Sequence, residues 1–219
     1  MYPALMRAFI CTACGTQYSP SEAPPGACLI CIDERQFVPA SGQSWTTLER
    51  LRNAHSNKFR RLATGLTTIE ATPVFGIGQR AILARTPAGN VLWDCIALID
   101  DATVDLLKGL GGISSIAISH PHYYTTMVEW SRALGGVPIH LHAADHQWVM
   151  RADPAVQFWE GGTKPIGPGS RWFGWEDTST AAPSCTGRTG AKAAAYYSRA
   201  TSCRWSRAGT SALCGRTRT

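Results

Sequence analysis

Two pairs of cysteines near the N-terminus place the strongest constraint on how this chain can fold. Cys11 and Cys14 are separated by two residues, as are Cys28 and Cys31, and thirteen residues lie between the pairs. The first 40 residues hold few apolar side chains among several prolines and glycines, too few for an independent core. Four thiolates at this spacing can reach the corners of a tetrahedron around one metal ion. We therefore predict that a bound metal ion supplies the folding free energy of residues 1–40.

The ion predicted at these four cysteines is zinc, held in a closed structural site. Rubredoxin-type iron uses the same four thiolates and stays open as an alternative. A redox-active dithiol would need only one of the pairs, and unliganded cysteines would leave the segment without a core. Metal-bound thiolates are typical of a reducing compartment, and no apolar stretch that could serve as a secretion signal precedes Cys11. We therefore expect a cytoplasmic protein.

The net charge of +6 is distributed unevenly along the chain. Residues 1–169 carry 13 Lys and Arg against 13 Asp and Glu, whereas residues 170–219 carry 8 against 2. A basic protein can bind nucleic acid, but here the body of the chain is neutral, so the sequence does not favour a nucleic-acid partner. The sequence contains no apolar run long enough for a transmembrane helix, so no membrane partner is expected either.

Changes in composition divide the chain into four segments. The last of them, from Ser170 to Thr219, contains no Val, Ile or Met and only one Phe and one Leu. Such a stretch cannot bury enough apolar surface to offset the entropy lost on ordering, and we expect it to be disordered. The predicted segments are a zinc ribbon over 1–40, a helical connector over 41–66, an α/β domain over 67–169 and the basic tail over 170–219.

Strands and helices are expected to alternate through the third segment. Alternating apolar residues, turn formers and helix-capping residues indicate these elements. Their order predicts a layered α/β domain whose loops at the C-terminal strand ends form the site. The expected strands are 80–85, 90–98, 113–119 and 137–141, and the expected helices begin near 100, 126 and 143. A connector helix is expected before them, from near 45, because Thr46 and Glu49 stand at capping-box spacing.

Two histidines follow the most strand-like of these runs, 113–119. His120 and His122 are two residues apart, and in extended backbone such residues point the same way. Pro121 keeps His120 out of the helical region of backbone conformation. The two imidazoles can therefore bind one metal ion together. The alternative is that one histidine simply ends the strand and the spacing is a coincidence.

A second pair at the same spacing, His140 and His142, ends the next expected strand. Because the carboxyl ends of neighbouring parallel strands meet at one edge of a sheet, this cluster could face the same cleft. His142 and Asp145 fall just beyond the strand, and with Tyr124 they are candidate wall residues of the site. An ordinary role at the rim or as a helix cap is the alternative. The sequence leaves the catalytic residue unknown.

Three short runs of residues resemble those of a known family. They are IAISHPH at 116–122, WDC at 93–95 and HLHAAD at 140–145, and the first follows two expected strands and a helix. Together they resemble the first half of a metallo-β-lactamase-fold hydrolase, in a bacterial subgroup with an N-terminal zinc ribbon. The resemblance covers residues 8–168. It implies an αββα sandwich, of which residues 67–169 are the N-terminal half, and a zinc or other divalent metal ion at His120 and His122.

The resemblance is incomplete where the family completes its metal site. In a motif of type HxHxDH, Tyr124 stands in place of the aspartate and Thr125 in place of the next histidine. The family's later ligands are a histidine in a Gly-Gly-His turn and an aspartate after a strand, but no histidine follows His146 in this chain. The resemblance therefore implies a metal ion held weakly at His120 and His122 and an impaired enzyme.

The tail permits a second reading that would supply the missing half. If each codon is re-read with the last base of one codon and the first two of the next, residues 171–187 admit VVRLGGHFDGSTVLHW and residues 196–207 admit LLLSGDILQVVP. The terminal residues admit VSFMRSYPN in the same shift. The first string contains a Gly-Gly-His turn and the second a Ser-Gly-Asp segment. We hypothesise a single-base loss near Gly169, through a sequencing error or a lesion in the gene.

Two functions follow as expectations. The first is a metal-dependent hydrolase that acts on an ester, thioester, amide or phosphoryl bond of a small-molecule substrate and is impaired in this chain. In the intact family the metal lowers the pKa of its bound water toward about 7, which makes hydroxide available. The alternative is a zinc-ribbon interaction module whose arginine-rich tail contacts nucleic acid. The neutral body of the chain favours the hydrolase.

Overall fold

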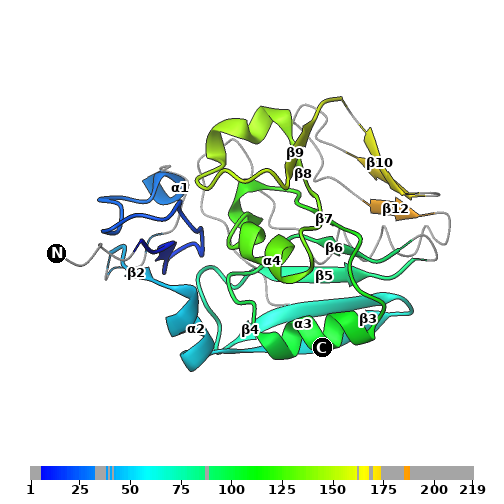
Figure 1. The fold of residues 1–219 in the computed structure, drawn as a ribbon, viewed down its shortest axis with the longest axis horizontal. Coiled ribbons are helices and arrows are strands. Elements are labelled where there is room, and N and C mark those ends of the chain that lie inside the picture. Colours follow the sequence, from blue (N-terminus) through cyan, green and yellow to red (C-terminus); the bar gives the residue numbers. More distant parts are fainter. Residues whose placement is uncertain are drawn as a thin grey trace. The chain divides into compact units, whose positions relative to one another are not determined.

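The computed structural model describes residues 6–32, 38, 40, 42–86, 89–161, 163–167, 170–173 and 185–187. The chain divides into two compact units, Met1–Glu160 and Gly161–Thr219. In these ranges the first unit contains the cysteine segment (the described residues between 6 and 46), a connecting helix and a seven-stranded sheet. The second unit contains a three-stranded sheet. Figure 1 labels the elements in chain order.

The cysteine segment consists of short elements joined by turns. β1 (Ile10–Cys11) pairs with β2 (Trp45–Thr46), and α1 (Leu29–Ile32) carries the last of the four cysteines. A bridge between Ile10 and Gln17 closes the turn around the first cysteine pair. Among the described residues, the buried core of this segment contains six, namely the four cysteines, Ala13 and Ile30. This core is as small as the composition predicts.

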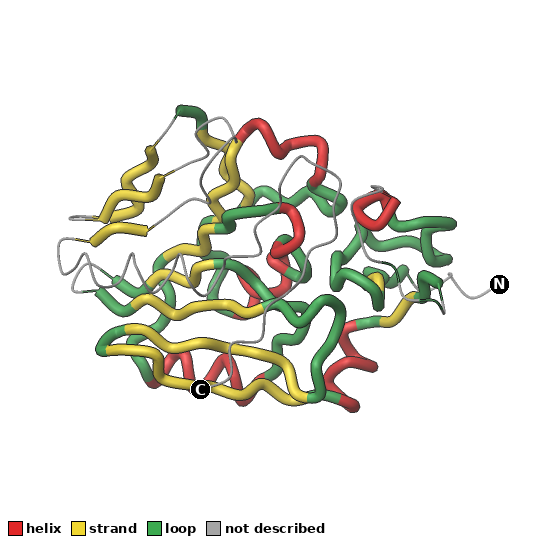
Figure 2. The backbone as a smooth tube through the Cα atoms, turned by 180° about the vertical axis from the view of Figure 1, so that it is seen from behind, coloured by secondary structure: helices red, strands yellow, loops and turns green. Residues whose placement is uncertain are grey.

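The large sheet has seven strands that neighbour one another in chain order, and Figure 2 traces them in yellow. Pairing is antiparallel from β3 to β6 and parallel from β6 to β9. Parallel neighbours need a crossover connection, and helices supply it in this second part of the sheet. The strands are β3 (Ser56–Ala63), β4 (Leu66–Thr72), β5 (Arg80–Ala84), β6 (Val91–Trp93), β7 (Ser115–Ala117), β8 (Ile139–His142) and β9 (Val156–Trp159).

Four helices of the described chain lie between the parallel strands, and one of them is the short 3-10 helix η1 (Pro121–Tyr123) after β7. α3 (Asp101–Gly109) joins β6 to β7, α4 (Met127–Ala133) joins β7 to β8, and the 3-10 helix η2 (Ala143–Trp148) joins β8 to β9. A carboxylate oxygen of Asp100 accepts a hydrogen bond of 2.7 Å from the Thr103 amide and caps α3. The expected α/β class is therefore confirmed. None of the helices in the described part of the chain is long and apolar enough to cross a membrane.

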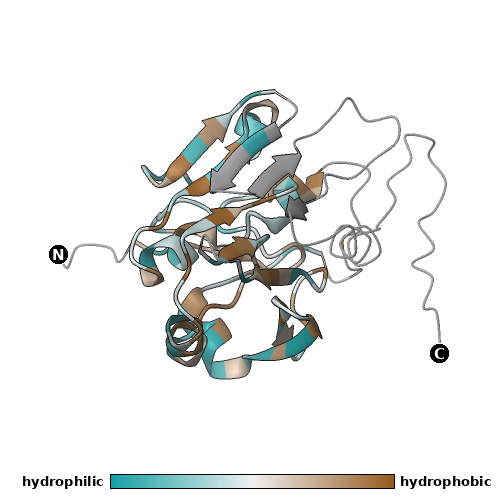
Figure 3. Ribbon diagram, turned by 90° about the vertical axis from the view of Figure 1, so that its right-hand side faces the viewer, coloured by the Kyte–Doolittle hydropathy of each residue, from teal (hydrophilic) through white to brown (hydrophobic). Residues whose placement is uncertain are grey.

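The strand register places buried residues on both faces of the sheet. Hydrophobic residues, brown in Figure 3, recur along its central strands. On the face covered by α3 and α4, the aligned residues are Ile69, Ala81, Leu83, Leu92, Ile116 and Ile139. On the opposite face, the aligned residues are Thr68, Ile82, Trp93, Ala117 and His140, all of them buried. Burial on both faces is typical of parallel strands in layered α/β domains.

Some expected boundaries differ from those in the structure. The connector helix α2 (Leu48–Ala54) is capped by Thr47, whose hydroxyl accepts a hydrogen bond from the Arg50 amide, and Thr46 instead ends β2. The second half of the expected connector forms β3, an edge strand of the large sheet. Its many charged residues hide it from a search for apolar alternation, because its strand conformation depends on pairing with β4. The expected strand 90–98 ends at Trp93, where the chain turns.

The second unit is described in three strands. β10 (Thr163–Gly167), β11 (Ser170–Phe173) and β12 (Cys185–Gly187) pair in an antiparallel sheet of that order. β11 and β12 fall within the predicted tail, 170–219. The rest of that tail, and Gly169, lie outside the described residues, so the disorder expected for them stays a prediction.

Candidate functional site

The four cysteine sulfurs lie close together in the cysteine segment. The Sγ atoms are all within 4.8 Å of one another, with 3.8 Å between Cys11 and Cys31 and 3.6 Å between Cys14 and Cys28. Zn–S bonds of about 2.3 Å in a tetrahedral site would hold sulfur atoms about 3.8 Å apart. All four side chains are buried. The cluster therefore has the geometry of the four-thiolate metal site expected from the spacing.

Several polar groups surround the sulfur of Cys28. The Tyr18 hydroxyl donates a hydrogen bond of 3.4 Å to this sulfur and accepts one of 2.7 Å from the Leu29 amide. The Tyr18 ring packs edge-on against Trp45, with ring centroids 5.2 Å apart. Hydrogen bonds from the Cys11 thiol, the other two thiols and Tyr18 lower the pKa of the Cys28 thiol. These donors favour the thiolate, which is the form that binds a metal.

His120 and His122 lie just beyond the C-terminal end of β7. His120 has the extended backbone expected before a proline, and the 3-10 helix η1 (Pro121–Tyr123) follows it directly. The Nδ1 atoms of the two histidines are 2.8 Å apart, and their rings stack with centroids 4.7 Å apart. Two nitrogens bound to one tetrahedral zinc would be about 3.4 Å apart. The two Nδ1 atoms thus lie close together, and they would have to move apart by about half an ångström to bind one zinc ion.

The histidine pair lacks a third ligand among the residues whose positions are known. In the described ranges, the four cysteines are the only group of three or more His, Cys, Asp or Glu side chains close enough to share a metal ion. Tyr124 and Thr125, which stand where the resembled motif has its next two ligands, are each 3% exposed. A hydrolytic metal centre needs three protein ligands. The described residues therefore do not complete one.

The three candidate wall residues come from two loops and meet at Asp145: Tyr124 follows η1, His142 ends β8, and Asp145 lies in η2. Burial raises the pKa of Asp145, although a nearby His142 and a hydrogen bond from the Tyr124 hydroxyl oppose the shift. Burial and the Asp145 carboxylate raise the pKa of the Tyr124 hydroxyl. His142 also caps η2, because its Nδ1 accepts a hydrogen bond of 3.2 Å from the Ala144 amide. The ring of His142 meets Trp159 edge-on at 4.8 Å.

Asp94 contacts the loop between β7 and α4 that carries His120 and His122 (residues 118–126, the histidine loop). It is not among the site residues expected from the sequence. The Asp94 carboxylate accepts two hydrogen bonds from Ser119, the residue directly before His120. The Ser119 backbone amide donates one at 2.8 Å and the Ser119 hydroxyl donates the other at 2.9 Å. Asp94 is fully buried, and burial raises its pKa to about 7, although the hydrogen bonds from Ser119 oppose this. Its φ of 61° lies in the left-handed region, which Asp tolerates better than most residues. A carboxylate directly after a buried strand is the sequence signal that could have identified it.

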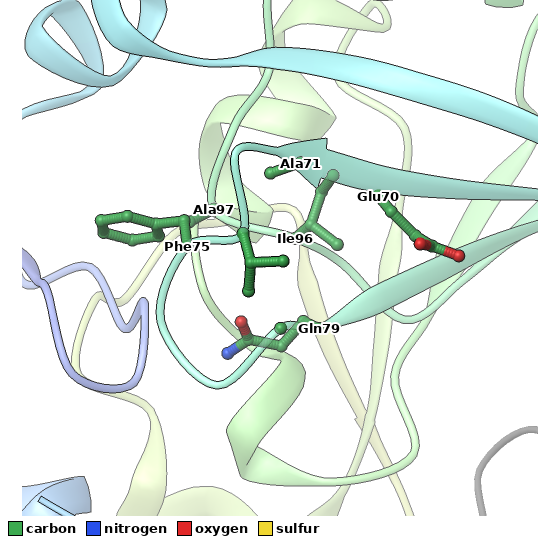
Figure 4. Close-up of a pocket in the computed structure, with 8 residues that line it drawn as sticks. Glu70, Ala71, Phe75, Gln79, Ile96 and Ala97 are labelled. Carbon is green, nitrogen blue, oxygen red and sulfur yellow. The ribbon is translucent and has the colours of Figure 1, made fainter. Parts of the chain in front are cut away.

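A small cavity lies between the β4–β5 loop and the chain that follows β6 (Figure 4). Its volume of about 30 Å³ is enough for one or two water molecules and too small for a substrate. It is lined by Glu70, Ala71, Val74, Phe75, Gly78, Gln79, Ile96 and Ala97.

Comparison of sequences relates this chain to one protein of Bacillus subtilis (strain 168). That protein is named "Uncharacterized protein YmaE" and is 44% identical over 163 residues, which make up 74% of this chain. The match spans 59% of the relative's own length. No family model matches the sequence.

Comparison of structures finds metallo-β-lactamases among the solved structures that match part of this chain. The metallo-β-lactamase DIM-1 is 8% identical, with a TM-score of 0.44 over 54% of this chain and 58% of its own. A metallo-β-lactamase from Pontibacter korlensis is 16% identical, with a TM-score of 0.41 over 54% of this chain and 59% of its own.

Proposed function

We propose that this chain descends from a metal-dependent hydrolase of the metallo-β-lactamase superfamily and is itself impaired as an enzyme. The observation that carries the proposal is the pair of imidazole nitrogens 2.8 Å apart at the end of β7. Loops at the carboxyl ends of parallel strands are where layered α/β domains bind their ligands. The buried Asp94 supports the proposal further, because the hydrogen bonds that its carboxylate accepts from the backbone amide and hydroxyl of Ser119 fix the start of the histidine loop.

The intact enzyme would cleave an ester, thioester, amide or phosphoryl bond in a small-molecule substrate. A zinc or other divalent metal ion at such a site makes hydroxide available near neutral pH. His120 and His122 are the residues that would hold it here. Since the described residues offer no third ligand, we expect weak metal retention at this pair and little or no hydrolysis.

The purified 219-residue chain provides the test of this impairment. With added zinc, we expect no turnover above background on a set of ester, thioester and phosphodiester substrates, and one zinc per chain, bound by the cysteines. The variant His120→Ala/His122→Ala should behave like the parent chain, as should the control His146→Ala, which changes an exposed histidine outside the pair. Zinc-dependent turnover that disappears only in His120→Ala/His122→Ala would refute the impairment.

We further propose that a shifted reading frame near Gly169 accounts for the missing ligands. The face of the sheet opposite α3 and α4 carries Ile82, Trp93 and Ala117, and such a face needs a second apolar layer. The re-read strings are rich in Val and Leu, whereas residues 170–219 contain no Val, Ile or Met.

Two experiments test the frame proposal. A chain that carries the re-read residues after Gly169 should bind a second metal ion and hydrolyse one of the substrates, and His122→Ala should abolish both properties. Resequencing the gene should reveal the lost base. A restored chain that folds but binds one metal ion only, or a gene with no lost base in codons 165–175, would reject the proposal.

A nucleic-acid-binding ribbon module is the second candidate, and the charge of the tail favours it. Phosphate contacts by several arginines would make binding fall steeply with salt. A mobility-shift assay should compare the full chain, a chain without residues 170–219, and the variant Cys11→Ser/Cys14→Ser. Binding that needs both the ribbon and the tail would support this candidate, and binding that needs the tail alone would indicate nonspecific charge.

We also propose a cytoplasmic location and no membrane partner. The four thiols lie together without a disulfide, as is typical of metal ligands in a reducing compartment. Cell fractionation should find the full-length protein in the soluble cytoplasmic fraction. Recovery with membranes would contradict this proposal.

A further inference from the structure

One buried side chain, that of Gln79, connects the turn of the first cysteine pair (residues 11–16, the knuckle) to the histidine loop. Gln79, labelled in Figure 4, precedes β5 and is 6% exposed. Its amide nitrogen donates one hydrogen bond to the carbonyl oxygen of Cys14 and another, of 3.0 Å, to the carbonyl oxygen of His122. A single buried amide thus joins a residue of the four-cysteine cluster to a residue of the histidine pair.

Glycine allows the knuckle to approach this closely. Gly15 has a φ of +79°, and a Cβ atom there would lie 3.3 Å from the Gln79 amide nitrogen and 3.5 Å from a methyl group of Thr125. Gly76 approaches from the β4–β5 loop, where a Cβ atom would lie 3.3 Å from the Cys14 carbonyl carbon. The first cysteine pair and the loop of the two histidines are therefore packed closely around the Gln79 side chain.

A second set of hydrogen bonds runs beside the first. The backbone amide of Gln17 donates a hydrogen bond of 3.0 Å to the carbonyl oxygen of Thr125. The side-chain oxygen of Gln17 accepts a hydrogen bond from Arg151, and Arg151 also pairs with Glu129 of α4 at 2.6 Å. Arg151 is 6% exposed, so its guanidinium depends on these partners.

We propose that metal binding at the four cysteines positions the loop that carries His120 and His122. Gln79 couples the metal site to this loop, because its side chain is hydrogen-bonded to both. Without metal, the cysteine segment lacks a core that could hold the knuckle in place. Gln79 and Arg151 then lose hydrogen-bond partners at buried positions, and the loop is released. Gln79 is a positioning residue, since its bonds go to backbone carbonyls on both sides. The inference rests on the proposed cysteine metal centre and does not depend on hydrolysis.

Hydrogen exchange on the full-length chain tests this inference. Gln79→Met keeps the length of the side chain and removes its donors, and Gln157→Met is the matched control at an exposed position on β9. With one zinc per chain in each protein, the amides of 119–126 should exchange about tenfold faster in Gln79→Met and unchanged in Gln157→Met. Protection of β4 reports that each variant is folded. Equal exchange of 119–126 in Gln79→Met and the parent chain would overturn the proposal.

A zinc titration gives a second measurement that needs no change at Gln79. In the metal-free parent chain, protection of 119–126 should rise together with that of the knuckle amides of Cys11 and Gly15, and both should level off at one equivalent. His122→Ala should show the same coupling, because its backbone carbonyl is kept while the histidine pair is lost. Protection of the knuckle without any gain in 119–126 would overturn the proposal. Since neither measurement uses turnover, a failed hydrolase assay leaves both results intact.

Discussion

The cysteine segment and the large sheet lie within one unit but owe their stability to different interactions. The core of the sheet contains seventeen buried residues, from Ile69 in β4 to Leu141 in β8. The core of the cysteine segment contains six, four of which are cysteines. Apolar burial stabilises the first, whereas we expect the second to depend mainly on metal coordination by its cysteines. The two regions should therefore respond to different perturbations, although Gln79 and Gln17 connect them.

Removal of the metal should give the largest difference between the two regions. Structural zinc contributes roughly 10–16 kcal/mol of apparent binding free energy in small zinc-binding peptides. Chelation, or Cys28→Ser, should abolish hydrogen-exchange protection in residues 6–32 and leave β4 and β5 protected. Cys95→Ala is the control, because Cys95 is a buried thiol outside the cluster and its loss should leave one metal ion per chain. Persistent protection of residues 6–32 without metal would show that this segment has a core of its own.

Truncation in the sheet core should give the opposite response. Trp130 in α4 is fully buried, and its indole nitrogen donates a hydrogen bond of 2.8 Å to the carbonyl oxygen of Ile96. Trp130→Ala should lower the free energy of unfolding of the sheet by about 3–5 kcal/mol, as measured by urea denaturation. Metal content should stay at one ion per chain under native conditions. Loss of the metal in folded Trp130→Ala would break the distinction between the two regions.

The free energy of unfolding of the sheet should depend on pH, because the buried Asp94 carboxylate is costly to ionise. Burial raises the pKa of Asp94 from 3.8 to about 7, so the folded protein binds an extra proton between these values. The free energy of unfolding should therefore fall as the pH rises from about 4 to 7, by up to about 4 kcal/mol. Asp94→Asn keeps an acceptor for Ser119 and tolerates the left-handed backbone. Its urea-unfolding free energy should lack this fall, and an identical pH dependence in both proteins would contradict the assignment.

The smallest expected effect concerns the surroundings of the cysteine sulfurs. Tyr18→Phe removes the hydroxyl that donates to Cys28 and leaves the ring against Trp45. Loss of a hydrogen-bond partner of a metal ligand typically lowers metal affinity about 10–100-fold. Competition with a chromophoric chelator should detect this loss, while the free energy of unfolding of the sheet stays unchanged. Equal affinity in the two proteins would mean that the four thiolates alone determine metal retention.

Elements whose conformation is determined by residues adjacent in the sequence could be predicted from the sequence alone. The α3 helix follows its capping residue Asp100, and His120 has the extended backbone that Pro121 requires of the residue before it. Strand β3 could not be predicted in this way, because its residues are largely polar and its conformation comes from pairing with β4. The same reason applies to the end of β6, where the chain turns at Asp94 and its carboxylate accepts a hydrogen bond from Ser119, in the loop after β7.

The sequence by itself determined the two groups of candidate metal ligands, because the spacing of cysteines in each pair and of His120 and His122 is a property of a few consecutive residues. Only the tertiary structure decided what surrounds them. Asp94 reaches Ser119 across 25 residues, and Gln79 reaches Cys14 across 65 residues and His122 across 43. Such partners are set by strand order and packing, and no local pattern encodes them.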